Sequence, residues 1–206
     1  QGVGSKSLLL VEELAHADER LFLWLNGFVG TIPALDRVVT WLVSDYLIPV
    51  SMALALMMLW FTETDRKLRE RQQIGVFVAL TAMALSSLVV FIINDMYIRP
   101  RPFETLDVTL LFYRPTDPSF PSNAAAAAFG IAFAIWGVNR RIGYMFIAAA
   151  AVYSFSRVYA GVHYPLDIVA SALIAAPVTW LTFQGRNLLM PILKLVMKAA
   201  RILCLA

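Results

Sequence analysis

Ser156-Arg157-Val158-Tyr159-Ala160-Gly161-Val162-His163-Tyr164-Pro165-Leu166-Asp167 joins two strongly apolar segments of the chain. This stretch brings an Arg, a His and an Asp to the edge of those segments. Ionisable groups are costly at the edge of hydrocarbon, so we read them first as functional candidates. Two upstream pieces belong with the stretch, namely Arg99-Pro100-Arg101-Pro102 and Pro121-Ser122-Asn123-Ala124. We interpret the rest of the chain as a membrane scaffold that brings the three pieces together.

The composition favours an integral membrane protein. Of the 206 residues, 60% are hydrophobic and 15% are charged, whereas a soluble domain is about 45–50% apolar and about 25% charged. The formal net charge is +3 and no basic face with interleaved aromatic residues stands out, so we expect no nucleic-acid partner. The single cysteine, Cys204, excludes an internal disulfide framework and a multi-cysteine metal site. Residues 1–5 show no signal-peptide pattern, and we leave them out of the fold prediction.

Five apolar segments have the length that a transmembrane helix needs, about 20 residues. They lie at about 41–61, 74–93, 122–138, 142–159 and 165–183, the third being the shortest. Residues 7–29 and 187–205 mix apolar and charged residues at helical spacing, which is typical of helices that lie on the membrane surface, although the second is just long enough to span. The sequence therefore predicts an all-α membrane protein: one domain over residues 1–206, with a bundle of five to six transmembrane helices in a core at 35–185.

Loop charges predict the orientation of this bundle. The 62–73 loop, the 139–141 turn and the 186–201 tail fall on one side and are rich in Lys and Arg, so we expect that side to be cytoplasmic. The 94–121 connection and the 160–164 turn then face outward, and all three chemical pieces share the outward face. Asp45, near the outer end of the first predicted span, is either a functional carboxylate or a residue of the helix end at the interface.

Three arginines and the N-terminus of a predicted helix indicate that the ligand is a phosphate group. Prolines after Arg99 and Arg101 keep both residues extended, and side chains two apart then point to the same face. Together with Arg157 they predict a phosphate-binding site, because guanidinium forks match phosphate oxygens; the alternative is arginines that snorkel to lipid head groups. Ser122 is suited to cap the next helix, and the free N–H groups there, such as that of Asn123, form a ready anion site.

His163 is the candidate nucleophile. Proline is favoured in the first helical turn, so Pro165 places His163 just before the last span and Asp167 within its first turn. A carboxylate on one ring nitrogen fixes the tautomer and leaves the other nitrogen free to attack; the alternative is a capping Asp beside an interfacial His. A metal or cofactor is not predicted, because His16 and His163 are the only histidines and no carboxylate cluster completes a shell.

The order Arg-Pro, Pro-Ser-x-x, then Ser-Arg-x5-His-x3-Asp resembles the type 2 phosphatidic acid phosphatase superfamily of membrane lipid phosphatases. The third motif matches in full from Ser156 to Asp167, and the helical layout agrees over roughly 35–185. The resemblance implies a metal-independent hydrolase in which His163 attacks phosphorus and forms a phosphohistidine while Asp167 orients its ring. It also implies that Arg101 and Arg157 hold the phosphoryl oxygens, with Ser122 and the Asn123 amide nearby.

Two positions depart from the family pattern. Asn94 stands where the family has a lysine, seven residues before Arg101, which removes a charge that Arg99 partly supplies. Ala124 stands where the second motif usually has the general-acid histidine. Either the chain is a natural inactive homologue or Ala124 is an engineered replacement, and the otherwise intact site favours a replacement. Because a general acid contributes about 10²–10⁴-fold, we expect low activity from the chain as written.

The small size, the outward site, the Arg-Pro-Arg-Pro run and the Ser119-Phe120-Pro121-Ser122 context look most like the bacterial undecaprenyl-diphosphate phosphatase branch of that superfamily. This implies a lipid substrate in the bacterial inner (plasma) membrane, a site on the periplasmic or extracellular face, and a product used in cell-wall biogenesis. The alternatives are a phosphatidylglycerophosphate or lipid A phosphatase and a non-catalytic lipid-phosphate-binding homologue. Five further residues are either substrate contacts or loop-packing residues, namely Tyr97, Tyr113, Arg114, Asp117 and Tyr164.

Overall fold

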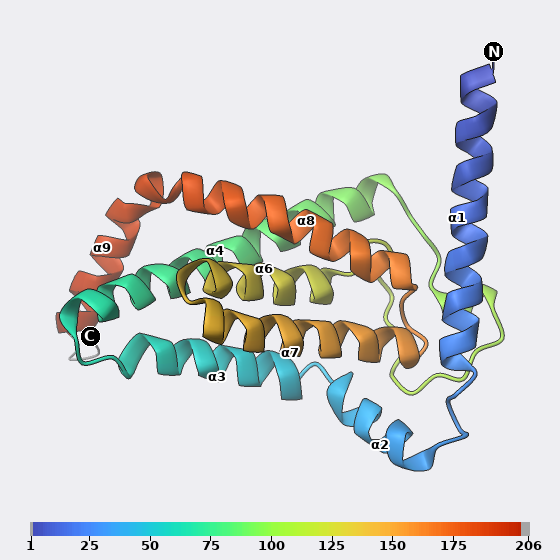
Figure 1. Ribbon diagram of the computed structural model, residues 1–206, viewed down its shortest axis with the longest axis horizontal. Coiled ribbons are helices and arrows are strands. Elements are labelled where there is room, and N and C mark those ends of the chain that lie inside the picture. The colour runs from blue at the N-terminus through green and yellow to red at the C-terminus, as the bar shows by residue number, and fades with distance from the viewer. Residues whose placement is uncertain (1, 203–206) are drawn as a thin grey trace.

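The computed structural model describes residues 2–202, and these form helices joined by loops, with no strand among them. Five helices run side by side as a bundle (Figure 1), namely α3 (Leu47–Phe61), α4 (Arg66–Met96), α6 (Asn123–Val138), α7 (Arg140–Tyr159) and α8 (Pro165–Gln184). The predicted all-α class is therefore confirmed. Cys204 and the end of the predicted 187–205 helix lie outside the described residues.

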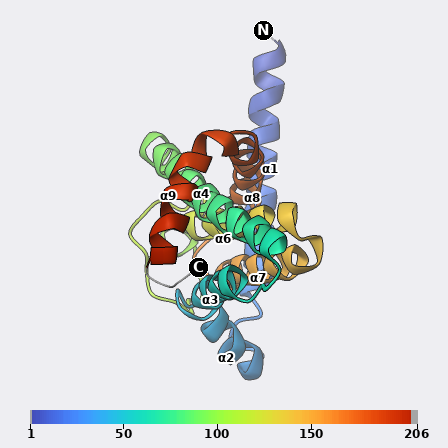
Figure 2. The same cartoon turned by 90° about the vertical axis from the view of Figure 1, so that its left-hand side faces the viewer.

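Helix α6 lies at the centre of the bundle, packed against α4, α7 and α8 (Figure 2). Its first half is an alanine run, and small residues let helices approach closely in a membrane. Gly130 shows how close the approach is, because an added Cβ would lie 3.2 Å from the Ala82 carbonyl oxygen on α4. This central position lets α6 be buried by other helices although it has only 16 residues.

The number of membrane spans differs from the prediction. Within residues 2–202, three helices (α4, α7 and α8) are long and apolar enough to cross a membrane. Helix α2 (Pro33–Leu42) and α3 would together make a fourth span, bent by 47°. The predicted span at 41–61 is thus interrupted at the break after α2, where the Ser44 hydroxyl donates to Trp41 O and accepts from Leu47 N. An integral membrane protein is supported, whereas the count of five to six spans is not confirmed.

The two terminal helices leave the direction of the bundle. Helix α1 (Gly2–Asn26) stands across one end of the bundle, and α9 (Arg186–Ile202) turns away at the opposite end (Figure 1). The first begins at Gly2, within the segment that the fold prediction left out. Apolar side chains of α1 such as Leu14 and Trp24 are exposed, which suits the predicted helix on a membrane surface.

The predicted polar loop at 62–73 is mostly helical. Helix α4 begins at Arg66 because the Asp65 carboxylate accepts hydrogen bonds from the N–H groups of Lys67 and Leu68. Such a side-chain cap satisfies donors that have no partner within the helix. The loop that joins α3 to α4 is therefore shorter than the charge pattern suggested.

The two ends of the bundle carry different chemistry. One end holds the starts of α3, α6 and α8, the ends of α4 and α7, and the connection that contains short α5 (Pro102–Thr105) (Figure 1). All three motif pieces therefore meet at this end, as predicted. The opposite end holds the basic start of α4, the turn at Asn139 and the α8–α9 junction.

Candidate active site

His163 is held in a buried turn between α7 and α8. Gly161 has a φ of +90°, a backbone conformation that glycine adopts without a Cβ clash, and Val162 N donates to Arg157 O at 3.1 Å. The His163 side chain is only 2% exposed. Its Nδ1 lies 2.9 Å from the carbonyl oxygen of Ser119, whereas the nearest Asp167 oxygen is 3.6 Å away. A carbonyl only accepts, so Nδ1 carries the proton and Nε2 keeps its lone pair.

The free Nε2 of His163 faces two hydrogen-bond donors. The Ser122 hydroxyl lies 3.1 Å away and Arg101 Nη1 lies 3.2 Å away. Ser122 is also the N-cap of α6, as predicted, since its oxygen accepts from Ala125 N at 3.4 Å. A nucleophile, a cation and a helix start therefore meet at one point.

The guanidinium of Arg101 is fixed around this point. It is 1% exposed, and its Nε and Nη2 donate to the main-chain oxygen and the carboxylate of Asp117 at 2.8 and 3.0 Å. Its Nη1 donates to Val162 O at 2.9 Å. These bonds aim Nη1 at the imidazole, so an anion bound at Nε2 meets a positioned charge.

Arg157 approaches from α7 beside a second carboxylate. Its Nη1 donates to Asp45 Oδ1 and to the Tyr153 hydroxyl, both at 3.1 Å, while its buried Nε has no hydrogen-bond partner. Asp45 also accepts from the hydroxyl groups of Tyr113 and Tyr153. Of the two interpretations of Asp45, this geometry favours the functional carboxylate, because it sets the position of a candidate phosphate ligand.

Arg99 has different partners from the phosphate site that we predicted for it. Its Nη1 lies 2.6 Å from Asp167 Oδ1 and its Nη2 lies 2.8 Å from Asp18 Oδ2. The guanidinium also stacks on Tyr164, 4.0 Å from the ring centroid. Asp167 in turn accepts from the Ser119 hydroxyl at 2.6 Å. Arg99 therefore lies behind the imidazole, paired with carboxylates, and its phosphate contact stays a prediction.

The remaining predicted site residues lie at the edge of this cluster. Asn94 is in the last turn of α4, with its Oδ1 buried and without a hydrogen-bond partner. Asn123 begins α6 with an exposed side chain, and Ala124 follows it, half-buried. Within residues 2–202, no hydrogen bond joins the side chain of either asparagine to His163 or Arg101. Their roles stay predictions.

Electrostatics keep the imidazole neutral. Burial lowers the pKa of His163 to about 4; Asp167 opposes this shift, and the positive charges of Arg101 and Arg157 add to it. At pH 7 the ring is therefore uncharged, which a nitrogen nucleophile requires. The 3.6 Å separation is long for a hydrogen bond, so Asp167 acts on the ring mainly through its charge.

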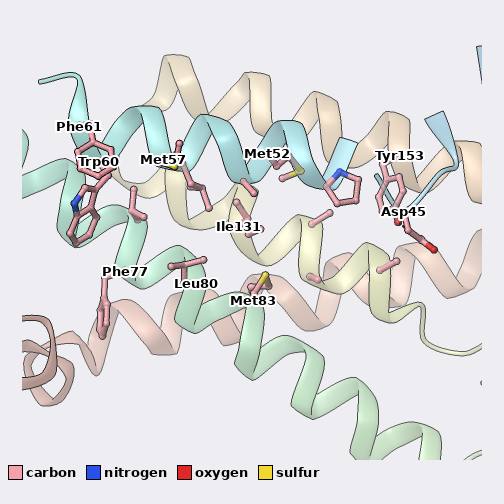
Figure 3. A pocket seen from close by; sticks show the side chains of 17 residues that line it. Asp45, Met52, Met57, Trp60, Phe61, Phe77, Leu80, Met83, Ile131 and Tyr153 are labelled. Atoms are coloured by element: carbon pink, nitrogen blue, oxygen red, sulfur yellow. Dashed lines mark hydrogen bonds between the residues drawn. The ribbon is translucent and has the colours of Figure 1, made fainter. Parts of the chain in front are cut away.

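An apolar groove of about 710 Å³ runs from this end of the bundle between α3, α4 and α6 (Figure 3). Asp45 and Tyr153 line its site end, and Trp60 and Phe61 line its far end. Between them the walls are almost entirely hydrocarbon. Ala124, in the first turn of α6, also lines the groove. Helix α3, which forms one wall of the groove, has 15 residues and is about 22 Å long. The geometry thus joins an anion-binding end to a channel suited to an acyl or prenyl chain.

Asp18 and Ser119 were given no role in the predicted site, and Asp45 and Asp117 were named only as one of two alternatives. Asp18, Asp45 and Asp117 hold the three arginines, and Ser119 holds both the imidazole and Asp167. No local motif identifies them, because each meets its partner through tertiary structure.

The site can be compared with known proteins. The family model described as PAP2 superfamily matches residues 75–191. Undecaprenyl-diphosphatase BcrC of Bacillus subtilis is 30% identical over 179 residues, which covers 86% of this chain and 89% of that protein. An undecaprenyl-diphosphatase of Sulfolobus acidocaldarius is 36% identical over 86 residues, covering 41% of this chain and 42% of that protein.

Solved structures give the same answer. The crystal structure of Aquifex aeolicus LpxE has a TM-score of 0.59 and 30% identity, and the match covers 80% of this chain and 93% of that one. A transmembrane PAP2-type phosphatidylglycerolphosphate phosphatase from Bacillus subtilis also has a TM-score of 0.59, covering 85% and 87% of the two chains; at 19% identity this likeness speaks for the fold alone. The resemblance in the sequence motifs is confirmed: this chain belongs to the PAP2 superfamily of membrane lipid phosphatases.

Proposed function

We propose that this protein removes the terminal phosphate of undecaprenyl diphosphate and forms undecaprenyl phosphate. The observation that carries the proposal is the neutral His163 Nε2 beside Arg101 and Ser122, at the end of an apolar groove. The relatives named undecaprenyl-diphosphatase support this choice of lipid. A polyprenyl tail needs a long hydrocarbon wall, and a diphosphate needs fixed cations.

In the first step, His163 Nε2 attacks the terminal phosphorus. A nitrogen–phosphorus bond forms while the phosphorus–oxygen bond to the lipid phosphate breaks, and its electron pair leaves with that oxygen. Arg101 and Arg157 offset the charge on the transferring oxygens, which is the kind of electrostatic stabilisation that lowers such barriers most. In the second step, water attacks phosphorus, the nitrogen–phosphorus bond breaks and inorganic phosphate leaves.

The missing general acid limits this reaction unequally for different lipids. An alkoxide leaving group needs a proton badly, whereas a phosphate leaving group, with a second pKa of about 6, needs it much less. Ala124 lines the site end of the groove, next to where the leaving oxygen would emerge. We infer that this chain has low activity as written and that diphosphates are its better substrates.

The membrane arrangement that we propose follows from the two ends of the bundle. The basic end, with Lys67, Arg71 and Arg186, would face the cytoplasm, and the site would face the periplasm or the exterior of a bacterial inner membrane. Helix α6 would be a short fifth span surrounded by the others, while α1 and α9 would lie in the interfaces. Exposure of single cysteines placed at either end to a membrane-impermeant reagent tests this orientation.

Two alternatives to this function are each supported by a specific observation. The neighbour described as a phosphatidylglycerolphosphate phosphatase shares the fold, and LpxE shares 30% identity, so another lipid phosphate is a competing substrate. Ala124 favours a third reading, a homologue that binds lipid phosphate without turning it over. Substrate competition in detergent micelles separates these candidates.

The test is phosphate release from undecaprenyl diphosphate in detergent micelles, comparing this protein with its Ala124→His form. We expect a clear gain in the His form, smaller than the factor of about 10²–10⁴ that a general acid contributes with an alkoxide leaving group, and no gain when His163→Ala is added. Release from a glycerophospholipid phosphate but not from the diphosphate would move the assignment to another substrate. Binding without release in both forms would support the non-catalytic reading.

A further inference from the structure

Asp18 is a buried carboxylate in α1, where most of the side chains described, those of residues 12–26, are exposed. It is 4% exposed, and its side chain is completely buried. Both oxygens have partners in the bundle: Oδ2 accepts from Arg99 Nη2 at 2.8 Å, and Oδ1 accepts from Leu166 N at 2.9 Å. Helix α1 therefore reaches the first turn of α8, one residue away from Asp167.

These contacts continue without a gap to the imidazole. Arg99 Nη1 donates to Asp167 Oδ1 at 2.6 Å, and Asp167 Oδ2 accepts from the Ser119 hydroxyl at 2.6 Å. The main-chain oxygen of the same Ser119 accepts from His163 Nδ1 at 2.9 Å. Asp18, Arg99, Asp167, Ser119 and His163 thus form one series of hydrogen-bonded residues that begins in α1, buried except for the partly exposed Arg99.

Asp18, the first residue of this hydrogen-bonded series, fixes both Arg99 and the start of α8. Arg99 is a planar fork that faces one carboxylate with each terminal nitrogen, so removing either carboxylate frees the fork to turn toward the other. Leu166 N is one of the N–H groups that a helix start cannot satisfy by itself, and Asp18 satisfies it. Burial raises the pKa of the Asp18 carboxyl, while the hydrogen bond from Arg99 lowers it, so the charge of Asp18 depends on Arg99.

We propose that Asp18 is a positioning residue, which sets the orientation of the His163 ring through Arg99 and Asp167. The expected effect of Asp18 on turnover rests on the proposed function, whereas its effect on the orientation of the ring does not. Asp18 touches neither the reacting nitrogen nor the groove. Its effect therefore falls on the rate of phosphoryl transfer rather than on lipid binding.

Asn26 provides the matched control, because it anchors α1 to the same end of the bundle by another route. Its Nδ2 donates to Thr109 O at 2.9 Å and to Tyr159 O at 3.0 Å, and its Oδ1 accepts from Thr109 N at 3.0 Å. None of these contacts involves Arg99 or Asp167. Loss of Asn26 loosens α1, and loss of Asp18 does so while also breaking the chain to His163.

The first experiment compares Asp18→Ala, Asp18→Asn and Asn26→Ala in the Ala124→His form, with farnesyl diphosphate as the probe. We expect kcat to fall about 10-fold or more in both Asp18 variants with KM changed by less than about 2-fold, since small misplacements of reacting groups are this costly. Asn26→Ala should lower Tm to a similar extent and keep kcat within about 2-fold. The proposal would be overturned if the Asp18 variants and Asn26→Ala lost kcat equally, each in proportion to its decrease in Tm.

The second experiment does not depend on turnover. The chain has two histidines, so the ¹⁵N spectrum of labelled imidazoles in micelles contains two ring systems and His163→Gln assigns them. We expect His163 to show a protonated Nδ1 at neutral pH, a mixture of tautomers in Asp18→Asn, and an unchanged spectrum in Asn26→Ala. An unchanged His163 signal in Asp18→Asn rejects the positioning role. If the His163 signal shifts in Asp18→Asn but the Ala124→His form does not hydrolyse the diphosphate, the positioning role stands and the proposed substrate is rejected.

Discussion

The main-chain oxygen of Ser119 accepts the hydrogen bond of His163 Nδ1 at 2.9 Å, and Asp167 Oδ2 stands 3.6 Å from the same nitrogen. The imidazole is therefore oriented by the backbone of the connection before α6, while the carboxylate orders that connection through the Ser119 hydroxyl. Asp167 still supplies negative charge to the ring. This arrangement separates two tasks, ring orientation and charge, that a single carboxylate was expected to perform.

Acid should destabilise the fold through His163. Burial holds the pKa of its imidazole at about 4, below the ordinary value of 6.5. A depressed pKa stabilises the fold above about pH 6.5, and this contribution is lost as pH falls toward 4, because the unfolded state binds the proton first. The full difference corresponds to about 3 kcal/mol. Thermal unfolding in micelles between pH 7 and 4 measures it.

His163→Gln is the reference for that measurement, since it cannot gain the charge. We expect the difference in Tm between the two proteins to shrink as pH is lowered. A difference that stays constant from pH 7 to 4 would mean that the pKa of the ring is the same in the folded and unfolded states, as for an exposed imidazole.

Arg99 and Arg101 should differ in their effect on anion binding. Vanadate adopts the geometry of a transferring phosphoryl group, and Arg101 Nη1 lies beside the nitrogen that would bind it. We expect Arg101→Gln to weaken vanadate inhibition by about 10–100-fold, the value of one charge-assisted hydrogen bond. Arg99→Gln should lower kcat and change the vanadate inhibition constant by less than about 3-fold, because Arg99 is paired with two carboxylates. Similar losses of vanadate affinity would return Arg99 to the phosphate site.

Restoring a histidine at position 124 should help monophosphates more than diphosphates. The leaving group of a lipid monophosphate is an alkoxide, which depends on a general acid for about 10²–10⁴-fold of its rate. The leaving group of a diphosphate is itself a phosphate and needs less assistance. The ratio of kcat/KM for farnesyl monophosphate over farnesyl diphosphate should therefore rise in Ala124→His. An equal gain on both substrates would contradict a proton-donor role at this position.

The sequence predicted those parts of the site that depend on local patterns. Ser122 caps α6 because a serine before an apolar run accepts helix N–H bonds, and Pro165 starts α8 just after His163. The prediction that the three motif pieces share one end also holds, because helices that alternate in direction fix which loops meet. These features need no knowledge of distant contacts.

The pairing of the arginines could not be predicted in this way. Arg99 meets Asp18 across 81 residues, and Arg157 meets Asp45 across 112. Equal charge and equal Arg-Pro context made Arg99 and Arg101 look equivalent. In the structure Arg99 pairs with two carboxylates, whereas Arg101 pairs with one carboxylate and contacts the imidazole. The break between α2 and α3 was also missed, because apolar composition alone does not record that Ser44 bonds to nearby backbone groups instead of continuing a helix.

Blocking the apolar groove should impair long lipids selectively, and α3 offers a matched pair of positions. Ala53 lines the groove that ends at Ala124, whereas Ala55, two residues on, lines a smaller apolar cavity of about 330 Å³ between α3 and α7. We expect Ala53→Trp in the Ala124→His form to raise KM for undecaprenyl diphosphate by about 10-fold or more, since a filled groove forfeits the burial of several methylene groups at about 0.8 kcal/mol each. Ala55→Trp fills the other cavity and should leave KM within about 2-fold. Hydrolysis of p-nitrophenyl phosphate, which has no tail, should be the same in both variants. If Ala55→Trp raises KM for the long lipid and Ala53→Trp does not, the tail lies between α3 and α7; if both slow the tailless substrate, the substitutions disturb the bundle rather than the groove.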